Sequence, residues 1–205
     1  MKRPIHMNLP NTLTLARIFL VPLLVVVLLT EFAGRQVLGM PKELFGAAIF
    51  AIASVTDWLD GYIARRRRQV TWLGQVLDPI ADKLLTSAAF ISLVQLGLAP
   101  AWMVALIIGR EFAITGLHSL AYTRGIAIPV SPLGKIKMGS QVTAILLLIL
   151  GWRGVPWLAP VGYAALWVVV LTAVWSAVDY YRRFLLLLNA RVTDVSVVRA
   201  TRRAS

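Results

Sequence analysis

The sequence predicts an all-α integral membrane protein with six transmembrane helices. Of its 205 residues, 59% are hydrophobic, a larger share than an ordinary soluble domain carries. The apolar residues form six runs, each about as long as a helix that crosses a bilayer. Basic residues gather at alternate ends of these runs, which is the pattern of helices that share one cytoplasmic face.

Short polar segments separate the runs and set the bounds of each predicted helix. Residues 1–11 are polar and basic, and the first run after them is expected to remain as a membrane span. A connector containing Gly34, Arg35 and Gly39 follows it, and Pro100 marks a tight turn between the third and fourth runs. The predicted helices cover residues 12–32, 43–66, 72–98, 101–123, 133–152 and 157–188.

Residues 1–188 are thus predicted to form one six-helix domain, and the basic residues 189–205 a mobile C-terminal tail. If the N-terminus lies inside, the outer side carries few basic residues. The inner side would carry Lys2, Arg3, residues 65–68, Arg124, Lys135, Lys137, Arg182, Arg183 and the tail arginines, and the outer side only Arg35, Lys42 and Arg153. This asymmetry predicts a multi-pass protein of the cell (inner) membrane with both termini in the cytoplasm.

The net charge of +12, from 21 basic and nine acidic residues, is explained by this topology, so no nucleic-acid partner is predicted. The sequence contains no cysteine, which excludes disulfides and thiolate metal sites.

Four of the nine acidic residues lie between Asp57 and Asp82, at the facing ends of the second and third helices. Asp57 and Asp60 are three residues apart and Asp78 and Asp82 four apart, so each pair shares a helix face. Carboxylates brought together at a membrane edge repel one another and lose hydration. Mg²⁺ or Mn²⁺, which prefer oxygen ligands, would remove both penalties. The spacing therefore predicts a divalent-metal site.

A plainer interpretation is that the carboxylates are interfacial and pair with the arginines at 65–68, or that they cap helices. Asp78 and Pro79 together form the pattern of an N-cap followed by a first helical residue. Gly61 and Gly74 are costly inside apolar helices and leave room for a ligand, although helix packing explains a single glycine equally well.

The motif D-x2-D-G-x2-A-R-x8-G-x3-D-x3-D, from Asp57 to Asp82, resembles the signature of the CDP-alcohol phosphotransferases. This resemblance implies the fold of that family: a six-helix membrane enzyme, usually a homodimer, that uses two divalent metals. It implies that Asp57, Asp60 and Asp78 are metal ligands and that Asp82 both ligates metal and takes the proton of the attacking hydroxyl. The residues implied to contact the CDP moiety are Gly61, Ala64, Arg65, Gly74 and, in the loop, Thr71.

Charged residues in later helices bear on the acceptor. Arg110 and Glu111 fall near the middle of the fourth helix, where charge is costly and usually functional. Lys135 and Lys137 begin the fifth helix. Arg110 and the two lysines could form a pocket for the phosphate of a phosphorylated alcohol. An Arg110–Glu111 ion pair and lysines that anchor at lipid headgroups are the alternatives.

Residues 8–17, 109–111 and 134–141 are similar to segments of bacterial phosphatidylglycerophosphate synthases. That likeness implies transfer of a phosphatidyl group from CDP-diacylglycerol to sn-glycerol 3-phosphate, with release of CMP. It also implies that Asn11, Thr14 and Arg17 help to hold the nucleotide and that position 118 contributes to the acceptor pocket. His118 stands there in place of a second arginine, and Met138 in place of a threonine.

Other functions stay open on the sequence alone. The same chemistry could use phosphatidylglycerol, serine or an inositol phosphate as the acceptor. The aspartates could instead line the path of a divalent-cation transporter, although they gather at one face and no acidic ladder continues through the other helices. A membrane scaffold without catalytic activity is a third possibility.

Overall fold

The computed structural model describes residues 9–31, 36–37, 39–66, 72–123 and 133–204. Within these ranges, the description leaves out the side chains of residues 9–11, 58, 60–66, 72–76, 118–123, 133–137 and 183–204. The described helices are α1 (Leu9–Leu29), α2 (Lys42–Arg66), α3 (Trp72–Gln95), α4 (Ala101–Thr123), α5 (Leu133–Gly151) and α6 (Leu158–Ala204).

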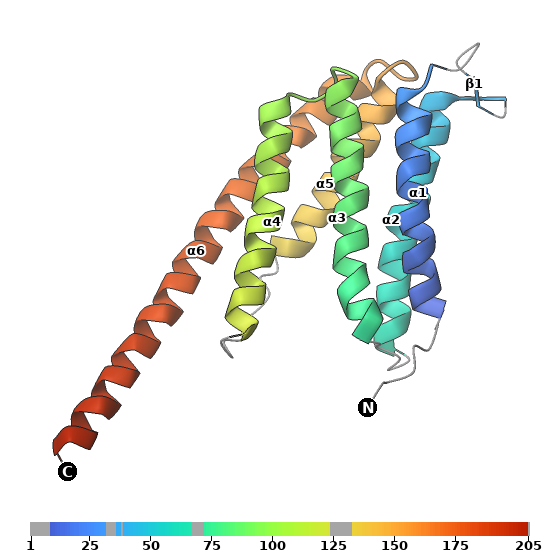
Figure 1. Ribbon diagram of the computed structural model, residues 1–205. Coiled ribbons are helices and arrows are strands. Elements are labelled where there is room, and N and C mark those ends of the chain that lie inside the picture. The colour runs from blue at the N-terminus through green and yellow to red at the C-terminus, as the bar shows by residue number, and fades with distance from the viewer. Residues whose placement is uncertain (1–8, 32–35, 38, 67–71, 124–132, 205) are drawn as a thin grey trace.

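Consecutive helices run in alternate directions, so the start of α1 and the end of α6 lie toward the same end of the bundle (Figure 1). α1 packs against α2 and α3, α5 against α2, α3 and α6, and α4 against α3 and α6. The C-terminal half of α6 leans away from the other helices (Figure 1). The arrangement places the end of α2 and the start of α3, which carry the four aspartates, at the end of the bundle where the termini lie.

Apolar side chains fill the interior and also cover the outside. The interior contains fully buried residues from all six described helices, among them Leu24, Phe50, Leu93, Met103, Ile145 and Leu166. On the outer surface Phe19 is 75% exposed, Trp175 71% and Leu171 63%. A soluble bundle would show polar residues on that surface, whereas helices surrounded by lipid are apolar all round.

Two described segments are long and apolar enough to cross a membrane by length and composition, Thr12–Leu29 and Leu158–Arg182. A shorter apolar stretch covers Met138–Gly151 in α5. No such segment is found in the described parts of α2, α3 and α4. The six predicted spans therefore stay a prediction, while the six helices themselves are present.

The predicted helix bounds agree with the structure to within three residues, except at the end of α6. That helix continues through Ala204 instead of ending at residue 188. The interpretation of residues 189–205 as a separate mobile tail stays a prediction. The connector after α1 contains a two-stranded antiparallel hairpin of β1 (Gln36–Val37) and β2 (Met40–Pro41), which the sequence analysis did not predict. Gly39 turns the hairpin with a φ of 79°.

Lys42 joins three elements at the end of the bundle away from the termini. Its side chain is buried, and Nζ donates to the carbonyl oxygens of Leu28 at 3.3 Å and Thr30 at 3.1 Å. The ammonium also lies 4.8 Å from the centre of the Trp152 ring, after α5. A cation at the carbonyl end of α1 complements the helix dipole, so Lys42 ties the end of α1 to α2 and to the α5–α6 turn.

Candidate active site

Arg17 of α1 contacts α2 at two successive turns. Its Nη1 lies 2.5 Å from Asp57 Oδ1, and its Nε donates to the carbonyl oxygen of Ala53 at 3.3 Å. The Arg17 side chain is 0% exposed, and that of Asp57 21%. The guanidinium therefore compensates the charge of Asp57 and fixes its carboxylate against α1.

Thr14, one turn before Arg17 on the same face of α1, contacts α3. Its buried Oγ1 donates to Asp78 Oδ1 at 2.6 Å. Thr14 and Arg17 thus hold one carboxylate from each of the two neighbouring helices. Through these contacts α1 brings Asp57 and Asp78, which are 21 residues apart in the chain, to the same region of the bundle.

The interpretation of Asp78 as an N-cap is wrong. α3 begins at Trp72, and Pro79 lies inside it. Asp78 is therefore an interior residue of the helix, and its carboxylate accepts a hydrogen bond from another helix instead of capping its own. The missing N–H of Pro79 leaves the preceding turn of α3 without one backbone hydrogen bond.

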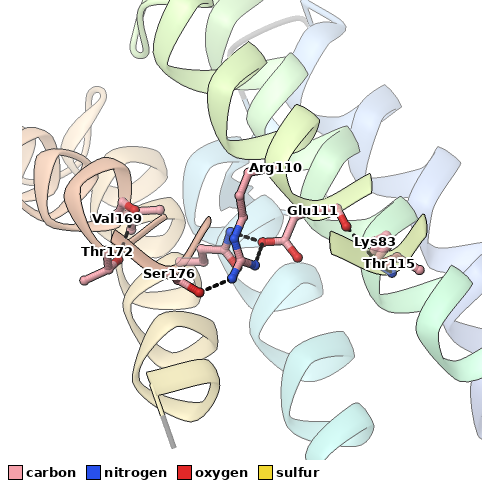
Figure 2. Close-up of polar contacts among 8 residues, drawn as sticks. Lys83, Arg110, Glu111, Thr115, Val169, Thr172 and Ser176 are labelled. Carbon is pink, nitrogen blue, oxygen red and sulfur yellow. Dashed lines mark hydrogen bonds and ion pairs between the residues drawn. The ribbon is translucent and has the colours of Figure 1, made fainter. Parts of the chain in front are cut away.

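Asp82 lies one turn beyond Asp78 on α3 and is half-buried. The next residue, Lys83, points to α4, where its Nζ donates to Thr115 Oγ1 (Figure 2). Thr115 Oγ1 in turn donates to the carbonyl oxygen of Glu111 at 2.8 Å. Lys83 is thus the link between the aspartate-bearing helix and the charged turn of α4.

Several predicted residues lie where the side chains are not described. Asn11 is in α1, Asp60, Gly61, Ala64 and Arg65 are in the last turns of α2, Gly74 is in the first turn of α3, and Thr71 lies outside the described residues. Among the side chains that are described, no group of three or more His, Asp or Glu residues is placed to hold a metal ion. Because Asp60 is not among them, the four-carboxylate site stays a prediction.

The chemistry of the described donors fits a hard divalent cation. Asp57, Asp78 and Asp82 offer carboxylate oxygens at the same end of the bundle, without thiolate or described imidazole donors beside them. Mg²⁺ and Mn²⁺ bind such oxygens, whereas Zn²⁺ in structural sites favours sulfur and nitrogen. The ion pair between Arg17 and Asp57 places one cationic side chain beside these acidic ones.

Arg110 of α4 is held from two sides (Figure 2). Its Nη1 lies 3.3 Å from Glu111 Oε1, and its Nη2 donates to Ser176 Oγ of α6. Gln141 of α5, which is buried, donates from Nε2 to the same Glu111 oxygen at 3.4 Å. The Arg110–Glu111 ion pair considered from the sequence is present, and it is also bonded to α5 and α6.

The other residues predicted to bind the acceptor phosphate have no described side-chain contacts. Lys135 and Lys137 lie in the first turn and a half of α5 and His118 in α4, but their side chains lie outside the described ones. The sequence analysis did not single out Ser176, Thr115 or Lys83. The available signal was that Ser176 and Thr115 are polar residues in largely apolar stretches and that Lys83 directly follows Asp82.

The sequence profile of the CDP-alcohol phosphatidyltransferases matches residues 7–175 of the chain. The chain belongs to this family. The matched region contains the aspartates, the Thr14 and Arg17 contacts, and the Arg110 turn. CDP-alcohol phosphatidyltransferases are membrane-associated and generally use divalent metals, in agreement with the apolar surface and the oxygen donor set.

Several relatives within the CDP-alcohol phosphatidyltransferase family carry the same name. A protein of Bacillus subtilis (strain 168), named CDP-diacylglycerol–glycerol-3-phosphate 3-phosphatidyltransferase, is 46% identical over 184 residues, which cover 86% of this chain and 94% of that protein. Proteins of that name from Rickettsia bellii and Salmonella choleraesuis are 37% and 36% identical, over 85% and 84% of this chain and 94% and 92% of their own lengths.

Proposed function

We propose that this protein transfers a phosphatidyl group from CDP-diacylglycerol to sn-glycerol 3-phosphate, giving phosphatidylglycerophosphate and CMP. The main support is the 46% identity to a relative whose name states this activity, over nearly the whole length of both chains. The contacts of Thr14 and Arg17 with Asp78 and Asp57 add a structural reason, because they gather carboxylates from two helices.

The reaction is a substitution at phosphorus. A hydroxyl oxygen of glycerol 3-phosphate attacks the phosphorus that bears the diacylglycerol, and the bond from that phosphorus to the bridging oxygen of CMP breaks. CMP leaves with the bonding electron pair. Asp82 takes the proton of the attacking hydroxyl, as the positioned general base of the reaction.

Asp57, Asp60, Asp78 and Asp82 hold two ions of Mg²⁺ or Mn²⁺ in this proposal. When bound, such ions neutralise charge on the diphosphate and stabilise the leaving group. Arg17 and Thr14 contribute by fixing the orientation of two of these carboxylates before substrate arrives. Preorganised ligands do not have to be ordered at the moment of reaction.

The nucleotide contacts are proposed at the ends of α1, α2 and α3. The proposed set is Asn11, Thr14, Arg17, Gly61, Ala64, Arg65, Thr71 and Gly74. Thr14 and Arg17, whose described contacts are with carboxylates, act on the nucleotide through the metal ligands that they hold.

The acceptor phosphate is proposed to bind Arg110, Lys135, Lys137 and His118. Arg110 supports this assignment because its guanidinium has five N–H donors in a planar fork suited to phosphate. Its two described polar contacts, with Glu111 and Ser176, use only some of these N–H donors, so others can bind a phosphate.

We also propose six membrane spans, cytoplasmic termini and an active site that faces the cytoplasm, in a homodimer of the inner membrane. The alternating helix directions support the first three points, since they place the aspartate-bearing ends and both termini together (Figure 1). Arg153 and Lys42, two of the three basic residues predicted outside, both lie against the Trp152 ring at the other end.

The test is an assay of purified protein in detergent with CDP-diacylglycerol, Mg²⁺ or Mn²⁺ and a panel of alcohols. CMP release is expected with glycerol 3-phosphate and is expected to stop on addition of EDTA. If CMP is released only with phosphatidylglycerol, serine or an inositol phosphate, that alcohol is the acceptor and the proposed reaction type still holds. Passage of Mn²⁺ into liposomes without CMP release would favour the transporter instead.

A further inference from the structure

The charged turn of α4 is held by two helices that carry no metal ligand. Ser176 of α6 accepts a hydrogen bond from Arg110 Nη2, and Gln141 of α5 donates to Glu111, the ion-pair partner of Arg110, at 3.4 Å. Gln141 is 5% exposed and the Arg110 side chain 11%, so these bonds lie inside the bundle. Inside the bundle they are subject to little competition from water.

Glu111 and Ser176 hold the guanidinium directly, and Gln141 holds Glu111. The Glu111 carboxylate holds Nη1 from within α4, and Ser176 holds Nη2 from α6. Two anchors on the two terminal nitrogens fix both the position and the plane of the group. A planar fork must be oriented as well as placed if it is to bind a phosphate through two bonds.

The Nε donor of the fixed guanidinium has no partner among the described contacts. Nε of Arg110 is buried and has no hydrogen-bond partner within the described part of the chain. Buried donors in folded proteins are nearly always paired, so this N–H calls for an acceptor that the described contacts do not provide, and an anion bound beside Arg110 would provide it. A phosphate oxygen is an acceptor of the right charge.

We infer that Ser176 and Gln141 are positioning residues, which hold the Arg110–Glu111 pair so that the guanidinium can bind the phosphate of the acceptor alcohol. Because this inference rests on the proposed function, it concerns recognition of the acceptor and not of the nucleotide or the metal. It assigns α6, which carries none of the residues predicted for the site, a role in substrate selection.

The variants Ser176→Ala and Gln141→Ala test this role. We expect each to raise the KM for glycerol 3-phosphate by about tenfold, the effect of one hydrogen bond to a charged group. The KM for CDP-diacylglycerol and the metal concentration for half-maximal activity should stay as in the wild type. Ser176→Thr, which keeps the accepting hydroxyl, should retain most of the wild-type acceptor KM.

Thr172→Val is the matched control. Thr172 lies one turn before Ser176 on α6, and its Oγ1 bonds only to carbonyl oxygens of its own helix in the described contacts, at 2.8 and 3.0 Å. This variant loses a hydroxyl from the same helix without touching α4, and its kinetics should equal those of the wild type.

The outcomes separate this inference from the proposed function. Wild-type turnover with glycerol 3-phosphate, together with an unchanged acceptor KM in Ser176→Ala and Gln141→Ala, would overturn the positioning role alone. An equal rise in both substrate KM values would also overturn it, since that is the result of a general packing defect. Absence of wild-type turnover with glycerol 3-phosphate would overturn both.

Discussion

The two halves of the site are built differently. In α1–α3, side chains of α1 bond directly to carboxylates of α2 and α3. In α4–α6, side chains of α5 and α6 bond to two adjacent charged residues of α4. Arg17 and Thr14 bond straight to Asp57 and Asp78, at 2.5 and 2.6 Å. Arg110 and Glu111 are neighbours in one helix and are bonded by Ser176 and Gln141 from α6 and α5.

The difference corresponds to two kinds of ligand. Carboxylates that hold a metal need fixed oxygens at short range, and short charge-assisted bonds to α1 provide this rigidity. A phosphate that enters and leaves with each turnover needs donors that are oriented but not saturated, and Arg110 retains such a donor. The following variants are ordered from the largest expected loss of activity to the smallest.

Asp82→Asn should lower kcat by about a thousandfold, the typical contribution of a positioned general base. The amide can neither accept the proton of the acceptor hydroxyl nor carry the charge of the carboxylate. CMP release measures the effect. The control is Glu31→Gln, which removes an exposed carboxylate just after α1. Activity of Asp82→Asn close to that of this control would contradict the assignment.

Arg17→Met should lower kcat by about a hundredfold, since a buried charge that loses its partner costs about 3 kcal/mol. The partly buried carboxylate of Asp57 would then lack its guanidinium partner. Arg153→Met removes the same charge at the other end of the bundle, where the guanidinium lies 5.4 Å from the Trp152 ring centre, and should have little effect on turnover.

The double variant Arg17→Met/Asp57→Asn sharpens this test of the Arg17–Asp57 pair. If the two residues act as a pair, the losses in the two single variants should not add. Additive losses would show that Arg17 acts independently of Asp57.

Thr14→Val should raise the Mg²⁺ or Mn²⁺ concentration needed for half-maximal activity by about tenfold, because Asp78 loses one hydrogen bond to a charged group. Thr143→Val is the control, since Thr143 is bonded to its own helix at Gly139, with 2.8 Å between the two oxygens. A metal titration of CMP release separates the two. The same metal dependence in both variants would argue against a metal ligand at Asp78.

Lys42→Met should leave kcat and both KM values unchanged and lower the thermal stability of the protein in detergent. The substitution removes the ammonium, so the carbonyl oxygens of Leu28 and Thr30 lose their donor, at a cost of about 2 kcal/mol. A thermal unfolding curve measures the change. A shift in either KM would show that the two ends of the bundle are coupled.

Much of the fold could be predicted because its signals are local. Apolar runs and the glycine, proline and charged residues between them gave the helices α1–α5 to within three residues at each end. The β1–β2 hairpin was missed because a pair of two-residue strands leaves no periodic pattern. α6 was predicted too short because the polar residues after 188 were taken as the end of a membrane span, although polar residues continue a helix as readily as apolar ones.

The candidate site divides in the same way. The sequence alone gives the spacing of Asp57, Asp60, Asp78 and Asp82. That spacing indicates the family and predicts a metal that prefers oxygen ligands. The tertiary structure alone decided that Thr14 and Arg17 hold two of these carboxylates and that Ser176 bonds to Arg110 across 66 residues. Helix periodicity relates only residues three or four apart, so contacts between helices depend on how the bundle packs and not on any pattern along the chain.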